Sequence, residues 1–281
     1  MASPTHCPDC RAQVRAQEKD CPTCGRFVGF PNIRAAEQPE ELQALDGRYS
    51  AATLKAQGDG KQPAFTAYES ALGSSVAVVC RSLDQAKALI SSDSAVYTNF
   101  YHQVDSGGRR AEETSVEIRR QVTDARVFLN YPRQISFGAL SLDGRGVTSY
   151  GACSLVLKPA MIAHRATVFE ENTVEFCDRV CPEQTKPIPP GHRATWARRA
   201  LLAVTKAEPQ LEVHTLPGQF SRILMDGDRF VEVHVFGPFT RDSIDRLLIA
   251  KPTSKGDRAM VAGIRDVIQK DGLNIQVEEY T

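Results

Sequence analysis

The sequence predicts an α+β protein that begins with a small metal-binding module. Two CxxC pairs open the chain, Cys7-Pro-Asp-Cys10 and Cys21-Pro-Thr-Cys24. Beyond them, short apolar runs typical of strands are interspersed with helical patterns, without the regular strand–helix repeat of a parallel α/β sheet. The chain has neither a GxGxxG nor a GxxxxGKS/T motif, which argues against Rossmann and P-loop domains.

The composition limits the classes of partner. The 281 residues include 34 Lys and Arg and 34 Asp and Glu, so a nucleic-acid or membrane partner would need a local charged patch. No run approaches the roughly 18 apolar residues of a membrane helix, and the first residues lack the features of a secretory signal. We therefore expect a soluble cytoplasmic protein with no membrane partner. The eight cysteines suit a reducing compartment if four of them hold metal.

The two CxxC pairs are the most specific signal in the sequence. Cys7, Cys10, Cys21 and Cys24 supply four thiolates, the ligand set of a closed tetrahedral Zn²⁺ site. Such a site leaves no open position for a substrate, so the zinc is expected to be structural and to contribute on the order of 10 kcal/mol to folding. The module also carries basic residues, which suit either nucleic-acid contact or a solvated surface. They are Arg11, Arg15, Lys19 and Arg26.

The residues after the module are expected to form a helical connector. Apolar residues at helical spacing predict a helix over roughly 39–56, which we expect to dock on the following domain. Two glycines and a proline then predict a linker near 57–64. The predicted division is therefore a zinc ribbon at 1–30, a connector at 31–64 and a main domain at 65–281.

The first part of the main domain is predicted to contain two strands and two helices. Ser74–Cys80 has the pattern of a buried strand, and Ser82-Leu-Asp-Gln85 is a capping box that begins a helix to about residue 90. Ala95–His102 is predicted to be a second strand, with His102 at its end. Glu112–Leu129 is predicted to be a helix with one apolar face. That face comprises Ile118, Val122, Ala125 and Leu129.

A glycine-rich hairpin is predicted next. The strand-like runs Ile135–Leu142 and Val147–Lys158 flank the turn Asp143-Gly-Arg-Gly146. Its glycines would keep the backbone accessible to a ligand lying across the hairpin, and Ser149 and Tyr150 would supply a hydroxyl and a stacking ring. The alternative is an ordinary hairpin whose glycines serve only the turn.

A rival carboxylate pair and a second cysteine pair follow. Arg165–Phe169 is predicted to be a strand, and Glu170 and Glu171 directly after it are alternative catalytic carboxylates. Cys177 and Cys181 have CxxxC spacing without an evident fourth ligand, so we expect two unpaired thiols. The remaining predicted elements are a helix at 193–207, strands at 211–214, 247–250 and 273–277, and a helix at 258–270.

The strongest candidate for catalysis is Glu232, within the run Phe230–Phe236. A strand here would turn its three valines to one side and place Glu232 and His234 on the other. A carboxylate in such a position costs free energy unless it has a partner or a function. The alternative is a surface strand with two polar residues facing outward.

The order of these motifs resembles the ADP-ribosyltransferase family, including toxin-like members of the DarT type. The order is a strand that ends in Tyr101-His102, a glycine-rich hairpin with Ser149-Tyr150-Gly151, and a late strand with Glu232. The resemblance covers roughly residues 74–280. It implies a split β-sandwich with flanking helices that binds NAD as a substrate.

The resemblance also implies roles for individual residues. Glu232 would be the catalytic carboxylate, His102 would hold the nicotinamide ribose, and Tyr150 would stack on nicotinamide with Ser149 nearby. Tyr101, Gly151 and Arg165 would complete the NAD site. The chain would then be a glycosyltransferase that moves ADP-ribose to a macromolecule, expected to be RNA or DNA. A toxin or phage-defence role is implied, with an antitoxin or regulatory protein as a partner.

Two other functions stay open on the sequence. One is a non-enzymatic adaptor or sensor whose zinc ribbon binds nucleic acid or protein. The other is a metal-independent nuclease that uses His102 or His234 with Glu232. Binding of NAD would distinguish the transferase from both the adaptor and the nuclease.

Overall fold

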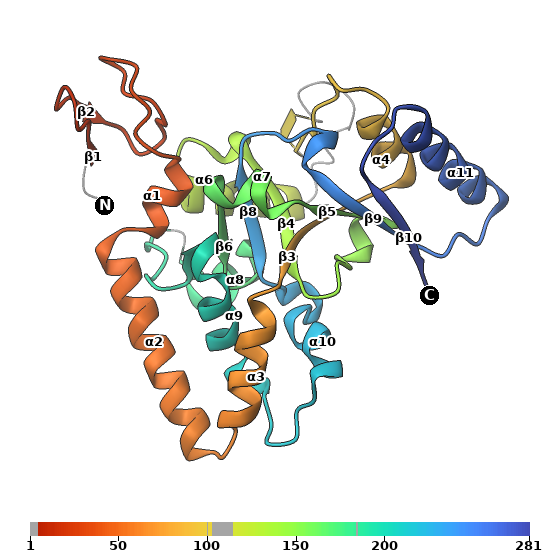
Figure 1. Cartoon of the computed structure of the whole chain (residues 1–281). Coiled ribbons are helices and arrows are strands. Elements are labelled where there is room, and N and C mark those ends of the chain that lie inside the picture. Colours follow the sequence, from red (N-terminus) through yellow and green to blue (C-terminus); the bar gives the residue numbers. More distant parts are fainter. Residues whose placement is uncertain (1–4, 100, 103–114, 184) are drawn as a thin grey trace.

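The chain is built around one large mixed sheet, with helices packed on it. The computed structural model describes residues 5–99, 101, 102, 115–183 and 185–281. Over these residues the strands form a two-stranded sheet in the N-terminal module and an eight-stranded sheet in the rest of the chain (Figure 1). The expected mixture of helices and strands is confirmed. None of the described helices is long and apolar enough to cross a membrane.

The large sheet has the order β10-β9-β5-β3-β4-β8-β6-β7. Neighbouring strands are antiparallel except β9 and β10, which are parallel. The strands are β3 (Val76–Arg81), β4 (Ile135–Ser141), β5 (Cys153–Leu157), β6 (Ala166–Phe169), β7 (Arg193–Thr195), β8 (Glu232–Phe236), β9 (Ile244–Ala250) and β10 (Gln276–Tyr280).

The sheet divides into two halves of four strands at the border between β3 and β4. Only three residue pairs join these strands, from Val76 opposite Ser141 to Val78 opposite Ala139. Residues 135–138 of β4 pair only with β8, and residues 79–81 of β3 pair only with β5. The two strands therefore diverge after Val78, and residues of both lie around the opening.

Helices cover both faces of the sheet. On one face, α2, α3, α9, α10, α4 and α11 share a single core with the valines of β8; α9 contacts β6, α10 contacts β4, and α4 contacts β5 and α11. On the other face, α6 and α8 lie over β4, β8 and β6 (Figure 1). The helices are α1 (Pro31–Ala36), α2 (Pro39–Gly58), α3 (Gln62–Leu72), α4 (Leu83–Ile90), α6 (Ser115–Phe128), α7 (Pro159–Ile162), α8 (Thr173–Val180), α9 (Arg199–Ala207), α10 (Phe220–Leu224) and α11 (Lys255–Lys270).

The connector helix α2 is docked as expected. It begins with Pro39 in its first turn, followed by two glutamates that favour a helix N-terminus. Arg48 on its surface forms an ion pair with Glu170 at 2.6 Å. The predicted linker at 57–64 is too long, because α2 continues to Gly58 and α3 begins at Gln62.

The predicted hairpin of β4 and β5 is wrong, because β3 lies between them and pairs with both. The glycines of this region serve close packing against β3. A Cβ on Gly151 would lie 2.2 Å from the carbonyl carbon of Arg81, and one on Gly146 would lie 2.5 Å from Sγ of Cys80. These glycines let the chain approach β3, so no ligand is needed to explain them.

Three other predicted elements differ from the structure. Ala95 to Asn99 forms no strand, and Tyr101 and His102 have helical conformation. The side chain of Asn99 fixes this segment by donating to the carbonyls of Arg133 and Ile135. Residues 211–214 form no strand, and the first three residues of the helix predicted at 193–207 form the edge strand β7. The predicted strands near β3, β6, β8 and β9 and the helices near α2, α4 and α11 are confirmed.

Candidate functional site

Glu232 lies in the middle of the molecule rather than on a surface strand. All five residues of β8 are buried, and Glu232 is 2% exposed. Its valine neighbours face the main core, as alternation predicted. Its own side chain faces α6 and α8 on the opposite side of the sheet.

Three donors bind the Glu232 carboxylate. Arg120 Nη2 donates to Oε1 at 2.8 Å, and the backbone N–H of Thr173, at the start of α8, donates to Oε2 at 3.2 Å. His234 Nε2 lies 3.0 Å from the same oxygen, and it must carry the proton because an ionised carboxylate only accepts. Burial alone would raise the pKa of Glu232, but the charge of Arg120 and the hydrogen bond from His234 lower it to about 2.

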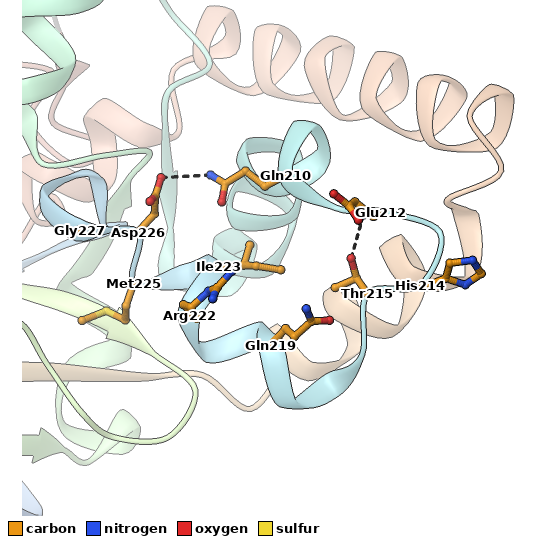
Figure 2. Close-up of a pocket in the computed structure, with 10 residues that line it drawn as sticks. All are labelled: Gln210, Glu212, His214, Thr215, Gln219, Arg222, Ile223, Met225, Asp226 and Gly227. Atoms are coloured by element: carbon orange, nitrogen blue, oxygen red, sulfur yellow. Dashed lines mark hydrogen bonds between the residues drawn. The ribbon is translucent and has the colours of Figure 1, made fainter. Parts of the chain in front are cut away.

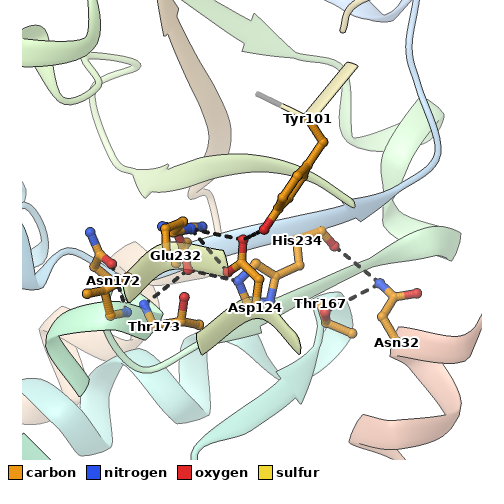
Figure 3. A network of polar contacts seen from close by, with 10 residues as sticks. Asn32, Tyr101, Asp124, Thr167, Asn172, Thr173, Glu232 and His234 are labelled. Carbon is orange, nitrogen blue, oxygen red and sulfur yellow. Dashed lines mark hydrogen bonds and ion pairs between the residues drawn. The ribbon is translucent and has the colours of Figure 1, made fainter. Parts of the chain in front are cut away.

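A chain of polar contacts continues from Glu232 through α6. Arg120 Nε lies 3.1 Å from Asp124, and Asp124 Oδ2 accepts a hydrogen bond of 2.7 Å from the Tyr101 hydroxyl. Figure 3 shows the Tyr101 hydroxyl directed at Asp124 beside Glu232 and His234. Burial raises the pKa of Asp124, and the Glu232 charge adds to that rise against the opposing charge of Arg120. Two carboxylates with pKa values shifted in opposite directions therefore lie on either side of Arg120.

A cavity of about 490 Å³ opens beside this chain, between the diverging strands β3 and β4. We call it the Glu232 cavity. Its walls come from β3, β4, the segment at Tyr97–Tyr101, α6, the turn at Tyr150 and the start of α8. The lining charged and hydroxyl side chains include Arg120, Asp124, Glu232, Tyr101, Tyr150, Glu175 and Asp228.

The structure brings together some of the residues predicted for NAD binding. Tyr101, Tyr150 and Glu232 all line the cavity. Tyr150 is 55% exposed, and partial desolvation of its hydroxyl raises its pKa, an effect that the charge of Arg120 opposes. Ser149 and Gly151 flank Tyr150 in the chain but do not line the cavity.

Two other predicted residues lie elsewhere. His102 is exposed and does not line the cavity; its backbone N–H donates to Asn99 Oδ1 at 3.1 Å. Arg165 lies at the far end of β8, where its Nη1 donates to the carbonyls of Phe236 and Pro238 at 2.6 and 2.9 Å. Arg165 therefore holds the strand end in place, a structural role that its position in the sequence did not indicate.

The rival carboxylates Glu170 and Glu171 belong to ion pairs away from the cavity. Glu170 is held by Arg48 at 2.6 Å and by His192 at 2.5 Å, and its pKa is lowered because these two partners outweigh the effect of burial. Glu171 is paired with Arg179 at 2.8 Å. Neither lines the Glu232 cavity. These ion pairs connect the end of β6 to α2 through Arg48, to the loop before β7 through His192, and to α8 through Arg179. The connections explain why the two glutamates are buried.

The apolar face predicted for the helix after residue 112 is wrong, and this error hid two site residues. Ile118 and Leu129 are more than half exposed, at 55% and 52%. The buried face of α6 instead includes Thr123 and Asp124, with Arg120 beside them. An Arg and an Asp four residues apart on the polar side of a helix were the available signal. A solvated ion pair would give the same pattern, so the sequence alone did not identify them.

The four N-terminal cysteines form a cluster that could hold a metal ion. The Sγ atoms of Cys7, Cys10, Cys21 and Cys24 all lie within 4.8 Å of one another, which suits four thiolate ligands on one ion. Among the described residues this is the only group of at least three potential ligands. Cys177 and Cys181 are buried and are not joined by a disulfide.

The module is tied to the strand that carries Glu232. Arg34 on α1 donates to carbonyls of the module at Gly29, Arg15 and Ala16. Two residues earlier, the buried Asn32 side chain donates to the carbonyls of Arg165 at 3.0 Å and His234 at 3.2 Å. A short segment therefore links the cysteine cluster to β6 and β8.

A second cavity, of about 550 Å³, lies between the turn after α9 and α10. Figure 2 shows its side chains, among them Gln210 bound to Asp226. It is slightly larger than the Glu232 cavity, but its polar side chains are exposed or only half-buried, and Glu232 is not among them. Buried, ionised groups held in fixed geometry distinguish the Glu232 cavity as the candidate site.

No protein-family model matches the chain, and no curated protein matches it significantly.

Proposed function

We propose that the chain is an NAD-dependent ADP-ribosyltransferase with Glu232 as its catalytic carboxylate. The observation that carries this proposal is that Glu232, Tyr101 and Tyr150, distant in the sequence, line one cavity. Its volume of about 490 Å³ lies within the range of roughly 300–1,000 Å³ for small-molecule sites.

The topology of the sheet supports the fold that goes with this function. The large sheet is continuous, and only three residue pairs between β3 and β4 join its two four-stranded halves. We propose these halves as the two parts of a split β-sandwich. The cavity lies where these halves diverge. In open sheets such divergence exposes backbone and side chains of both strands to a ligand.

The environment of Glu232 suits the chemistry of NAD cleavage. When the bond from ribose C1′ to the nicotinamide nitrogen breaks, its electron pair leaves with nicotinamide and C1′ becomes positively charged. A carboxylate that accepts a hydrogen bond from the ribose 2′-hydroxyl stabilises this charge as it develops. Glu232 remains ionised at neutral pH, because its pKa is about 2. Its carboxylate has about four acceptor positions, and three are used by protein donors.

Tyr150 is proposed to stack on the nicotinamide ring. Tyr150 lines the cavity and is 55% exposed, so part of its side chain is available for stacking. Tyr101 has a different role, because its hydroxyl is already bound to Asp124. We assign no NAD contact to His102 or Arg165. The nuclease alternative is weakened in the same way: His234 is 2% exposed and packs edge-on against Phe128 and Phe137.

The proposed acceptor is RNA or DNA, brought to the cavity by the N-terminal module with a structural zinc ion. Arg11 and Arg15 are exposed there, whereas Arg26 is paired with Asp9 and Lys19 with Asp20. A toxin or phage-defence role, regulated by a partner protein, follows from the resemblance in the sequence.

The first test measures transfer of label from NAD to RNA, DNA or lysate proteins. Wild type is compared with Glu232→Gln and Tyr150→Ala, and with Glu208→Gln as a control. Glu208 is also a buried glutamate, 3% exposed and paired with Lys55 at 2.7 Å, but it lies outside the cavity. We expect no transfer by Glu232→Gln and normal transfer by Glu208→Gln. Tyr150→Ala should weaken NAD binding by about fivefold to a hundredfold, the effect of losing one stacked ring.

Assays are run below the melting temperature of every variant, because Glu232 also contributes to stability. Release of nicotinamide without transfer would make the chain an NAD hydrolase and remove the macromolecular acceptor. No turnover of NAD by wild type, with any acceptor, would contradict the proposed function. Nucleic-acid binding that is lost with residues 1–30 would then favour the adaptor.

A further inference from the structure

The contacts of Arg120 suggest a further role for α6, one that rests on the proposed function. The guanidinium of Arg120 is held on three sides. It contacts Glu232 at 2.8 Å and Asp124 at 3.1 Å, and its centre lies 4.1 Å from the centroid of the Phe137 ring. Cation–π stacking on Phe137 fixes the plane of the guanidinium. The two carboxylates then fix its rotation within that plane.

Asp124 is the fixed end of this arrangement. Its side chain is fully buried, at 0% exposure, so it does not exchange Arg120 for water. One of its oxygens accepts from the Tyr101 hydroxyl at 2.7 Å, and both oxygens lie 3.1 Å from Nε of Arg120. Tyr101 thus anchors Asp124 from the segment before α6, and Asp124 anchors Arg120 from the next turn of the same helix.

We propose that Asp124 is a positioning residue, which with Tyr101 holds Arg120 so that the Glu232 carboxylate stays oriented toward the bound ribose. Asp124 need not touch the substrate in this role. Its effect passes through Arg120, which binds one oxygen of Glu232 while Thr173 and His234 bind the other. A carboxylate held in this way loses no freedom when the reaction begins, which favours the transition state.

The change in the pKa of Glu232 when Asp124 is replaced distinguishes the positioning role from a purely electrostatic role, because the two roles predict changes in opposite directions. The titratable and charged groups that contact Glu232 or lie next to those contacts are Arg120, Asp124 and His234. The cavity is also lined by other charged residues, namely Arg81, Glu117, Arg119, Glu175 and Asp228. If Arg120 stayed in place, removal of the negative charge of Asp124 would lower the pKa of Glu232 or leave it low. If Arg120 moved away, the pKa of Glu232 would rise, because burial would no longer be compensated.

The experiment follows the Glu232 carboxyl carbon by ¹³C NMR between pH 7 and pH 4, with Glu232→Gln to assign the signal. Asp124→Ala removes the acceptor for Arg120, whereas Asp124→Asn retains one acceptor oxygen. Tyr101→Phe removes only the anchoring hydroxyl. Asp178→Asn is the control, because Asp178 does not line the cavity and its half-exposed side chain pairs with Arg119 of α6.

We expect Glu232 to stay ionised throughout this pH range in wild type and in Asp178→Asn. Asp124→Ala should bring its protonation into the range, with smaller shifts for Asp124→Asn and Tyr101→Phe. In NAD turnover, kcat should fall about 100-fold for Asp124→Ala, with little change in KM, because misplacement of a reacting group mainly affects the transition state.

The titration separates this inference from the proposed function. A raised pKa without NAD turnover by wild type would contradict the function and leave the positioning of Glu232 established. An unchanged or lower pKa in folded Asp124→Ala would overturn the positioning role, whatever the activity. If Asp124→Ala does not fold, Tyr101→Phe decides: an unchanged titration together with unchanged kcat contradicts the proposal.

Discussion

The N-terminal cysteine cluster and the Glu232 cavity are built in opposite ways. The cluster takes its four ligands from 18 consecutive residues, Cys7 to Cys24, with no contribution from the main sheet. The Glu232 cavity takes its charged residues from β8, α6 and the segment at Tyr101, which meet only when the sheet is complete. The first site can therefore be recognised from spacing, and the second depends on tertiary packing.

The two regions also differ in what stabilises them. The small module has few apolar residues to bury, so we expect its stability to depend on a metal ion held by the four thiolates. The Glu232 region is surrounded by the aromatic rings of Phe128, Phe137 and Phe169, and its charges compensate one another. Loss of the metal ion should therefore affect the module, whereas loss of one charged side chain should affect the Glu232 region.

The largest effect is expected from removing metal. A strong chelator, or Cys21→Ser, should unfold the module and leave the large sheet intact, because only the module depends on the thiolates. Amide NMR signals of residues 7–28 should collapse while those of β3–β9 persist, with metal content measured in parallel. Equal loss of signals in both regions would show that the large sheet also depends on the thiolates, and would contradict the difference between the two regions.

The next effect concerns the ion pair between Arg120 and Glu232. Arg120→Met should destabilise the protein by about 3–5 kcal/mol, because it leaves the buried Glu232 carboxylate without its counter-ion. Urea unfolding at neutral pH measures the change. Arg119→Met is the matched control on the same helix: the exposed pair of Arg119 with Asp178 should contribute about 1 kcal/mol or less. Similar losses in the free energy of unfolding for Arg120→Met and Arg119→Met would show that the buried ion pair contributes no more to stability than the exposed pair.

Glu232→Gln should give a smaller, pH-dependent loss of about 3 kcal/mol at neutral pH, because Arg120 retains Asp124 as a partner. The folded-state pKa of Glu232 is about 2, below the usual 4.5. Its stabilising effect is therefore fully present above pH 4.5 and is lost as the pH falls toward 2. The unfolding free energies of wild type and variant should converge over that interval. A constant difference would contradict the assigned shift.

Asn32→Ala tests the connection between the two regions. It removes hydrogen bonds to β6 and β8 and should cost about 1–2 kcal/mol. Urea unfolding measures that cost, and metal content should stay unchanged, since Arg34 still holds the module to α1. A loss of metal would mean that the module depends on the sheet.

The smallest effect on stability is expected for Tyr150→Ala. This side chain is 55% exposed and forms no part of the main core, so its removal should change the melting temperature little. Calorimetry measures this change. A large loss of stability would show that Tyr150 is a packing residue, which would weaken its proposed role in binding a ligand.

The sequence by itself determined those features that depend on neighbouring residues. The CxxC spacing identified the cysteine cluster, and the alternation in β8 assigned the valines to the core and Glu232 to the other face. Helices α2, α4 and α11 were recognisable from apolar spacing and their start signals. Local geometry fixes each of these, whatever the rest of the chain does.

Only the tertiary structure decided which segments became partners. The insertion of β3 between β4 and β5 replaced a plausible local hairpin: β3 pairs with β5 through five residues and with β4 through three. The orientation of α6 also went against its apolar pattern. Burying Arg120 and Asp124 is tolerable only beside Glu232 and Tyr101, and no window of the sequence contains all four. Charge compensation between distant residues thus determined the site, whereas short-range spacing determined the metal cluster.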